Sequence, residues 1–433
     1  TTGTGTTSPG ATTSATTTAS TDADNTSAAL GDADALTRAL DEGDYTALTQ
    51  VVDEHVAPHA SEGAYATALV DALGARALVR VAAHLPTGTT TWTSLLATAT
   101  TSPLWTDEHQ EALARDLASL VTVTGDVAEP DTLLLPAGFM RLLTADQDPL
   151  TAAAAATRTP GAGDNQAPDS EDVRDPLALD PKFLAALTRG VMTGETTGGS
   201  RVGWVEYARL TTTAGGGYSN FPEGTPQDMT THRASYDPLP AVLTATARRP
   251  QTVLDVLAPP LPGAALGPSP GEEYEFRQGR ATKVDATTWE WVAARTQESG
   301  TACLEALTSA AASASTLRYK PTAPRTNPYE AQAAWLTEQA VVTLAGTDTT
   351  TWTPTARRTT AVILANSMSD VGDAAAKSAP DRGTSLFGAT LPVAWSGHHD
   401  AEVTALLREV LTDDTALSLL FKTLSVFNAY HIV

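Results

Sequence analysis

Residues 62–86 constrain the fold more than any other stretch, because they carry two apolar sets at helical spacing with a glycine between them. In a helix, side chains three, four and seven positions apart lie on one face. The two sets are Tyr65, Leu69 and Val70, followed by Leu78, Val81, Ala82 and Leu85. Gly74 separates the sets, and Pro86 follows the second one. The stretch therefore predicts two short helices joined at Gly74 and ended by a proline.

Signals for helix starts recur along the chain. An Asp or Asn side chain that caps a helix, followed by a proline at the first helical position, favours a helix start. Such pairs are Asp180-Pro181, Asp237-Pro238 and Asn327-Pro328. Together with apolar periodicity they predict helices at 32–41, 45–57, 62–72, 75–85, 89–98, 106–121, 136–145, 149–157, 181–193, 238–247, 250–257, 286–298, 300–314, 328–345, 354–370, 400–411 and 413–429. The best candidate for a strand pattern is a short hairpin around 201–207. We therefore predict an all-α protein, an irregular multi-helix array of amphipathic helix pairs with long Gly/Pro-rich loops.

The chain is longer than one hydrophobic core usually supports, so two or three subdomains are expected from its 433 residues. Thr, Ser, Gly and Ala dominate residues 1–27, a composition typical of a flexible linker. A polar Pro/Gly-rich stretch at 158–179 predicts a second linker. The helical subdomains are then expected at 28–157, 180–345 and 346–433.

Charge and cysteine content exclude several classes of function. The net charge of −23 argues against nucleic acid and against anionic membrane surfaces, because both need a basic face. No apolar run is long enough to insert into a membrane. Cys303 is the only cysteine, so neither an intrachain disulfide nor a cysteine-based zinc site can form. We expect no cofactor.

The densest group of possible metal ligands is His398, His399, Asp400 and Glu402. Adjacent histidines point to different sides of a helix, whereas a metal needs three or four convergent ligands, so we expect a structural role for this group. His55 and His59 have the spacing of a shared metal site, but Pro58 lies between them and is expected to end the helix.

Several apolar residues are candidates for a protein interface. Trp289 and Trp291 are two positions apart and cannot share one helix face, so one of them is expected to be exposed or to meet another element. The last predicted helix is apolar nearly all round, which indicates burial against another body. Its candidate residues are Leu420, Phe421, Leu424 and Phe427. Tyr218 and Phe221 belong to the aromatic loop 194–236, which is expected to be packed.

The order of helical blocks is also informative. The blocks lie at 61–86, 180–190, 236–250, 289–307 and 333–376. In this order the chain resembles an uncharacterised, helix-rich family of large actinobacterial proteins, whose members often carry a domain like those of type VII secretion substrates. The resemblance covers most of 45–433 and implies a helical body in a secreted or cell-surface context, with no catalytic residues to carry over. Two isoleucines and five lysines in the whole chain also indicate a GC-rich coding sequence, typical of actinobacteria.

We therefore expect a non-enzymatic helical scaffold or carrier that works through protein–protein contacts, as a subunit of a larger assembly or by self-association. Two alternatives remain open. One is a hydrolase or metal-dependent enzyme that uses the region from His398 to Glu402. The other is a module that binds a small ligand or glycan through the aromatic loop 194–236.

Overall fold

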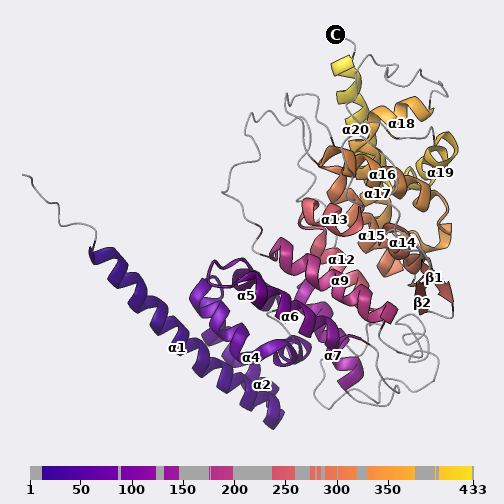
Figure 1. The fold of residues 1–433 in the computed structure, drawn as a ribbon. Helices are drawn as coiled ribbons and strands as arrows, with labels where there is room; N and C mark the ends of the chain where they lie inside the picture. The colour runs from indigo at the N-terminus through magenta and orange to yellow at the C-terminus, as the bar shows by residue number, and fades with distance from the viewer. Residues whose placement is uncertain are drawn as a thin grey trace, which may run out of the picture.

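The computed structural model describes residues 12–85, 89–122, 131–145, 175, 177–197, 237–258, 274–277, 280–283, 288–299, 301–318, 329–375, 395 and 399–431. These residues form an all-α array of packed helices with one short hairpin, so the predicted fold class is confirmed (Figure 1). The first helices are α1 (Thr12–Glu42), α2 (Tyr45–Val51), the π-helical turn η1 (Val52–Val56), α3 (Ala57–His59), α4 (Gly63–His84), α5 (Thr89–Thr101), α6 (Asp107–Leu120) and α7 (Asp131–Thr144).

The elements after the gap that follows α7 complete the array. The central ones are α9 (Pro181–Thr197), α12 (Pro238–Thr246), α13 (Pro250–Leu257), β1 (Tyr274–Arg277), β2 (Arg280–Lys283), α14 (Thr288–Ser299), α15 (Thr301–Ser315) and α16 (Glu330–Ala345). The last are the 3-10 turn η2 (Thr349–Thr351), α17 (Pro354–Asn366), α18 (Met368–Ala375), α19 (Asp400–Val410) and α20 (Asp414–His431).

The helix pair predicted from residues 62–86 is present as α4, with a break inside it. Gly74 has φ 65° and ψ 172°, which is not helical, so the axis changes direction there as predicted. This region of backbone space is almost restricted to glycine. Both halves pack inward against α1, α5 and α7. One of these contacts is a hydrogen bond from Trp92 Nε1 of α5 to the Leu78 carbonyl, at 3.0 Å.

Two of the predicted caps form. Asp237 Oδ1 accepts a hydrogen bond from the Leu239 backbone N–H at 3.0 Å, and Asp180 Oδ1 accepts one from Lys182 at 2.7 Å. The prolines that follow these caps are the first residues of α12 and α9. The third pair, Asn327-Pro328, lies outside the described residues, as do the predicted helix at 149–157 and the predicted hairpin around 201–207.

Two segments differ from the expectations for irregular chain. Helix α1 begins at Thr12, inside the stretch that composition indicated to be a linker. Alanines and leucines between Ala29 and Leu40 bury one face of α1 against α4. Once this part is helical, each further residue toward the N-terminus gains one backbone hydrogen bond, so the helix can extend to Thr12. The second difference is the β1–β2 hairpin, which lies between the predicted helices at 250–257 and 286–298, where no strand was expected; its antiparallel register pairs Tyr274 with Lys283.

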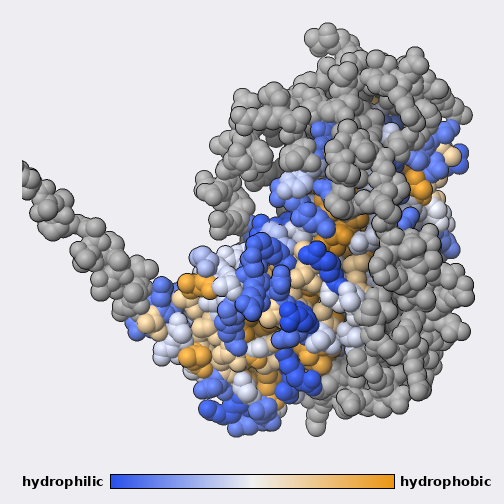
Figure 2. Space-filling model, viewed as in Figure 1, coloured by the Kyte–Doolittle hydropathy of each residue, from blue (hydrophilic) through white to orange (hydrophobic). Residues whose placement is uncertain are grey.

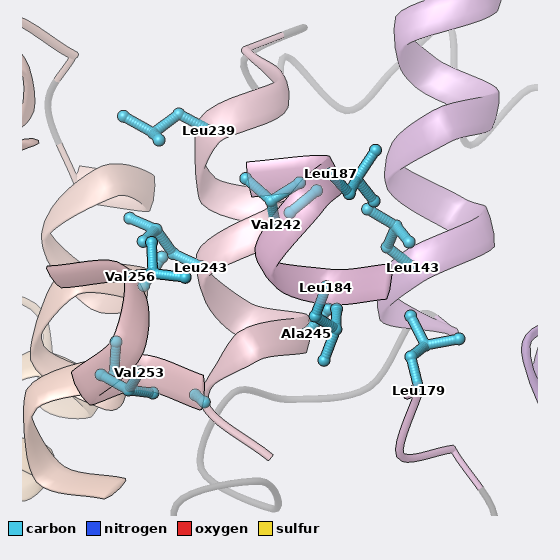
Figure 3. Close-up of a cluster of buried hydrophobic side chains, with 14 of the residues drawn as sticks. Leu143, Leu179, Leu184, Leu187, Leu239, Val242, Leu243, Ala245, Val253 and Val256 are labelled. Atoms are coloured by element: carbon cyan, nitrogen blue, oxygen red, sulfur yellow. The ribbon is translucent and has the colours of Figure 1, made fainter. Parts of the chain in front are cut away.

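The hydrophobic core runs without interruption from Ala29 in α1 to Leu420 in α20. Helix α12 lies at its centre and packs against α7, α9 and α15 (Figures 1 and 3). In Figure 3, Leu143 of α7, Leu187 of α9 and Val242 of α12 lie together, and Leu243 lies near Val256 of α13. Helices from before and after the predicted linker at 158–179 therefore share one hydrophobic core. The subdomain boundaries stay a prediction.

Several threonines within the core satisfy their hydroxyl groups locally. Each of these donates a hydrogen bond to the carbonyl four residues earlier in its own helix. Examples are Thr188 in α9, Thr246 in α12, Thr308 in α15 and Thr359 in α17, at 2.6–3.0 Å. Two pairs also meet across helices, Thr188 with Thr246 at 3.3 Å and Thr359 with Thr308 at 2.8 Å.

Candidate functional site

One of the candidate metal ligands, His399, belongs to a buried polar cluster between α16, α18 and α19. His399 directly precedes α19, and its Nε2 lies 2.8 Å from Oε1 of Glu338 on α16. Glu338 is only 4% exposed, whereas the His399 side chain is 19% exposed. The backbone of His399 is left-handed, with φ 47° and ψ 32°, a conformation that costs free energy for a residue other than glycine. The contact with Glu338 helps to hold the imidazole in this position.

Arg318 is the centre of the same cluster. Its Nη2 lies 2.7 Å from Oδ2 of Asp370, and its Nη1 donates to the hydroxyls of Ser367 at 2.9 Å and Thr337 at 3.3 Å. The guanidinium also lies over the ring of Trp395, 5.8 Å from its centroid. Trp395 donates its backbone N–H to Asp370 Oδ1 and its indole N–H to Thr337. Four segments of chain are therefore joined through one cation.

A further carboxyl group, Glu330, lies in the neighbourhood of Arg318. Glu330 is 5% exposed, and burial raises the pKa of its carboxyl, while the charge of Arg318 opposes that rise. The charge of Arg318 therefore acts on two buried carboxyl groups, Glu330 and Asp370, while Glu338 contacts His399.

The cluster contains a histidine with an orienting carboxylate, two of the three groups of a hydrolytic triad, but it has no nucleophile among the described residues. A buried carboxylate that orients a histidine is the base and its orienting partner in a catalytic triad. Among the residues that the structure describes, no hydroxyl or thiol hydrogen-bonds to His399, whose Nδ1 instead lies 4.0 Å from Glu402. Within the described ranges, no three His, Cys, Asp or Glu side chains are arranged to hold a metal ion. Asp400 is exposed, and His398 lies outside the described residues.

His55 and His59, the pair with the spacing of a shared metal site, do not converge on one point. The expectation that Pro58 ends its helix was wrong, because the chain passes through η1 and resumes as α3. Pro58 there occupies the first turn of α3, where its missing N–H costs little. His55 Nδ1 contacts Asp32 at 3.1 Å and His59 Nδ1 contacts Glu62 at 3.1 Å, so the two rings serve different carboxylates.

The two tryptophans named as interface candidates are in the core, where they meet other helices of the same chain; neither is exposed, so neither can contact another protein. Trp289 and Trp291 are 1% and 0% exposed. Helix α14 packs against α13, α15 and α16, which bury both of its sides, and this explains how residues two positions apart are both enclosed. The indole N–H of Trp289 donates to the Thr343 hydroxyl at 3.1 Å.

The last helix has one apolar side in the core and another in solvent. Leu420 is buried and faces the body of the protein, where α20 packs against α17 and α18, so it is not an interface residue. Phe421 is 61% exposed and Leu424 is 40% exposed, in agreement with their proposed role. The side chain of Phe427 is not described, and Tyr218 and Phe221 lie outside the described residues.

Single large apolar residues are also exposed on other elements, among them Leu30 of α1 and Leu411 after α19. On the face shown in Figure 2, hydrophilic residues are interspersed with small apolar patches over the N-terminal helices. None of the helices in the described ranges combines the length and the apolar character that crossing a bilayer requires.

The Arg318 cluster had no signal in the sequence. Its residues come from positions as distant as 318 and 395 and show no local motif. Sequence reasoning singled out His399 and Glu402 as possible metal ligands and expected a structural role for them, but it did not identify the buried Glu338 that His399 contacts.

Comparisons with known proteins place the chain in a family without a known activity. No curated protein and no solved structure matches it significantly. A family model matches residues 92–433, which include α5 to α20 and both the Arg318 cluster and the exposed side of α20. The chain therefore belongs to a family of unknown function, DUF6571.

Proposed function

We propose that the protein is a non-enzymatic helical scaffold that acts through protein–protein contacts, and that α20 carries the contact between two copies of the chain. The observation that supports this proposal is the exposure of Phe421 and Leu424 on a helix whose opposite side is in the core. Leu417, which is half-buried, precedes them at helical spacing and extends the apolar stripe. Large exposed apolar residues grouped in this way are typical of interaction sites.

Charges on α20 favour a second copy as the partner. Asp414 and Lys422 are both exposed and lie eight residues apart; Asp414 precedes the apolar stripe along the helix axis, and Lys422 lies between Phe421 and Leu424. When two α20 helices pack antiparallel about a point near position 418, Asp414 of each copy lies opposite Lys422 of the other. In this register Phe421 of each copy lies opposite Thr415 of the other, and the two equivalent ion pairs make the contact self-complementary, as a twofold interface requires. For a chain of net charge −23, such local pairing offsets the general repulsion between copies.

Light scattering after size-exclusion chromatography tests this proposal. We expect a dimer at about 100 µM that dissociates on dilution, as mass action requires. Phe421→Asp should shift the protein to monomer. The matched control is Ala405→Asp, which adds the same charge to an exposed position on α19, outside the proposed contact. A wild-type chain that is monomeric throughout this range would refute the α20 contact.

A charge exchange gives a sharper test of the geometry. Asp414→Lys and Lys422→Asp should each weaken the dimer, because each places like charges opposite one another. The double variant restores opposite charges and should recover dimerisation. If the double variant is weaker than both single variants, the antiparallel arrangement is wrong.

We further propose that the protein is exported or displayed on the cell surface of an actinobacterium, by a type VII secretion-like route. The resemblance in helix order and the scarcity of isoleucine and lysine support this proposal. Fractionation of a native culture tests it. The protein should appear in the culture filtrate or the cell envelope, and should leave the filtrate when the secretion ATPase is deleted. Retention with cytosolic markers would contradict export.

A further inference from the structure

A small pocket lies between α14, α15 and α16. Its volume is about 200 Å³. The turn after α16 and η2 form one lip. The lining residues are Ala293, Thr296, Gln297, Leu304, Leu307, Thr343, Leu344, Gly346, Thr347, Asp348 and Thr351.

The pocket has an apolar floor. Leu304 and Leu307 of α15 contribute to it, together with Leu344 of α16 and Ala293 of α14. All four residues are buried in the continuous core or at its edge. An apolar group that entered the pocket would therefore contact hydrocarbon and displace water from it.

The rim of the pocket offers hydrogen-bond acceptors. A threonine hydroxyl has one proton and two lone pairs. Thr296 gives its proton to the Val292 carbonyl at 2.8 Å, and Thr351 gives its proton to the Asp348 carbonyl at 2.7 Å. The oxygen atoms of both hydroxyls keep acceptor capacity, so the rim suits a ligand that donates hydrogen bonds.

One negative charge lies at the rim. Asp348 is the only charged residue among the lining residues that the structure describes. Its Oδ1 accepts the Thr350 backbone N–H at 2.9 Å, and hydrogen bonds from Thr350 lower the pKa of this carboxyl, so the group is ionised at neutral pH. The strongly negative chain as a whole also attracts cations.

We propose that this pocket binds a small amphipathic ammonium ion, namely a primary amine on a short apolar stem. The stem enters between Leu304, Leu307 and Leu344, and the ammonium group donates to Asp348 and to the threonine oxygens. The small volume, about 200 Å³, limits the size of the ligand. A free metabolite-sized amine therefore fits better than a larger ligand.

Three probes with the same stem test this assignment by NMR titration of the protein. They are n-hexylammonium, 1-hexanol and hexanoate, which are cationic, neutral and anionic. We expect saturable binding of hexylammonium in the millimolar range, at least about fivefold weaker binding of hexanol and no binding of hexanoate. Equal binding of hexanol and hexylammonium would refute the role of the charge, and absence of saturable hexylammonium binding would refute the site.

Two variants locate the site. Asp348→Asn keeps an oxygen that can accept the Thr350 N–H, removes the charge, and should weaken hexylammonium binding about tenfold. Asp53→Asn is the matched control, because Asp53 is exposed on η1 and its substitution changes the net charge equally. Equal losses in both variants would mean that the amine senses only the overall charge and would overturn the proposal.

A lysine side chain of another protein presents the same chemistry, and a fourth probe separates the two sources. Nα-acetyl-lysine methylamide carries an ammonium group on four methylenes, followed by two peptide groups. We expect it to bind more weakly than hexylammonium, because its peptide groups do not fit the apolar floor. Tighter binding of the lysine derivative would assign the pocket to a protein-borne lysine instead of a free amine.

Discussion

At the scale of single residues, Arg318 is the side chain on which most of the polar cluster depends. It is the one guanidinium that contacts Asp370, Ser367 and Thr337 together within the described chain. Its removal leaves Asp370 buried without its cationic partner. We expect Arg318→Ala to reduce the free energy of unfolding by about 3–5 kcal/mol, measured by urea denaturation. Arg408→Ala, at an exposed position of α19, should change it by less than about 0.5 kcal/mol. Similar effects of the two substitutions would contradict the central role of Arg318.

The buried carboxyl group of Glu330 should make the stability of the protein depend on pH. Burial raises the pKa of its carboxyl in the folded state above the unfolded value, so the folded state holds this proton more tightly. Stability attributable to Glu330 is therefore greatest at low pH and falls as pH rises through the two pKa values. Glu330→Gln cannot ionise, so we expect it to be more stable than wild type at neutral pH, with an advantage that disappears below about pH 4. Urea denaturation at several pH values measures this difference. An advantage that grows toward low pH would show that the sign is wrong; Glu42→Gln, at an exposed glutamate, is the control.

At the scale of helices, the break in α4 is the clearest test of local structure. Gly74 has a positive φ and an extended ψ, so a Cβ there is strained although no atom lies within 4 Å of it. We expect Gly74→Ala to lower the free energy of unfolding by about 1–3 kcal/mol. Gly31 is exposed in the middle of α1 and also has open space around it, so Gly31→Ala should instead raise stability by up to about 1 kcal/mol. Thermal unfolding of the two variants should therefore shift in opposite directions, and a neutral Gly74→Ala would mean that α4 is continuous.

Local signals predicted most helices well, because caps, prolines and apolar spacing act over a few residues. The starts of α9, α12, α13 and α17 are all as expected. Contacts between distant helices could not be predicted in this way. At Gly138 a Cβ would lie 2.2 Å from the Val79 carbonyl, so α7 approaches α4 closely, yet nothing near Gly138 in the sequence indicates its partner. The burial of Trp291 and the contact of His399 with Glu338 depend on tertiary packing in the same manner.

At the scale of the whole molecule, the continuous core makes a prediction about cooperativity. Helix α12 connects α7 and α9 with α15, so the N-terminal helices cannot separate from the rest without exposing its apolar surface. We expect one unfolding transition in urea, with far-UV circular dichroism and tryptophan fluorescence changing together. Five of the eight tryptophans lie in the range from Trp289 to Trp395, so fluorescence reports mainly on the C-terminal half. Circular dichroism reports on helices throughout the chain. A loss of helix that precedes the fluorescence change would instead support independent subdomains.

The buried threonines affect how the hydrophobicity of the whole chain should be judged from its composition. A threonine whose hydroxyl bonds to its own helix has its polar group satisfied there, and the hydroxyls that reach a neighbouring helix, Thr188 with Thr246 and Thr359 with Thr308, meet one another, so in packing such a threonine resembles valine. Thr188, Thr246, Thr308 and Thr359 act in this way in the core. The hydrophobic share of 42% therefore understates the effective hydrophobicity of the helices. Replacement of Thr188 and Thr246 by valine removes both hydroxyls of one buried pair, a change that is nearly neutral when shape is kept. Drift between threonine and valine is thus tolerated at these sites, and threonine content alone is a poor guide to which segments of such proteins fold.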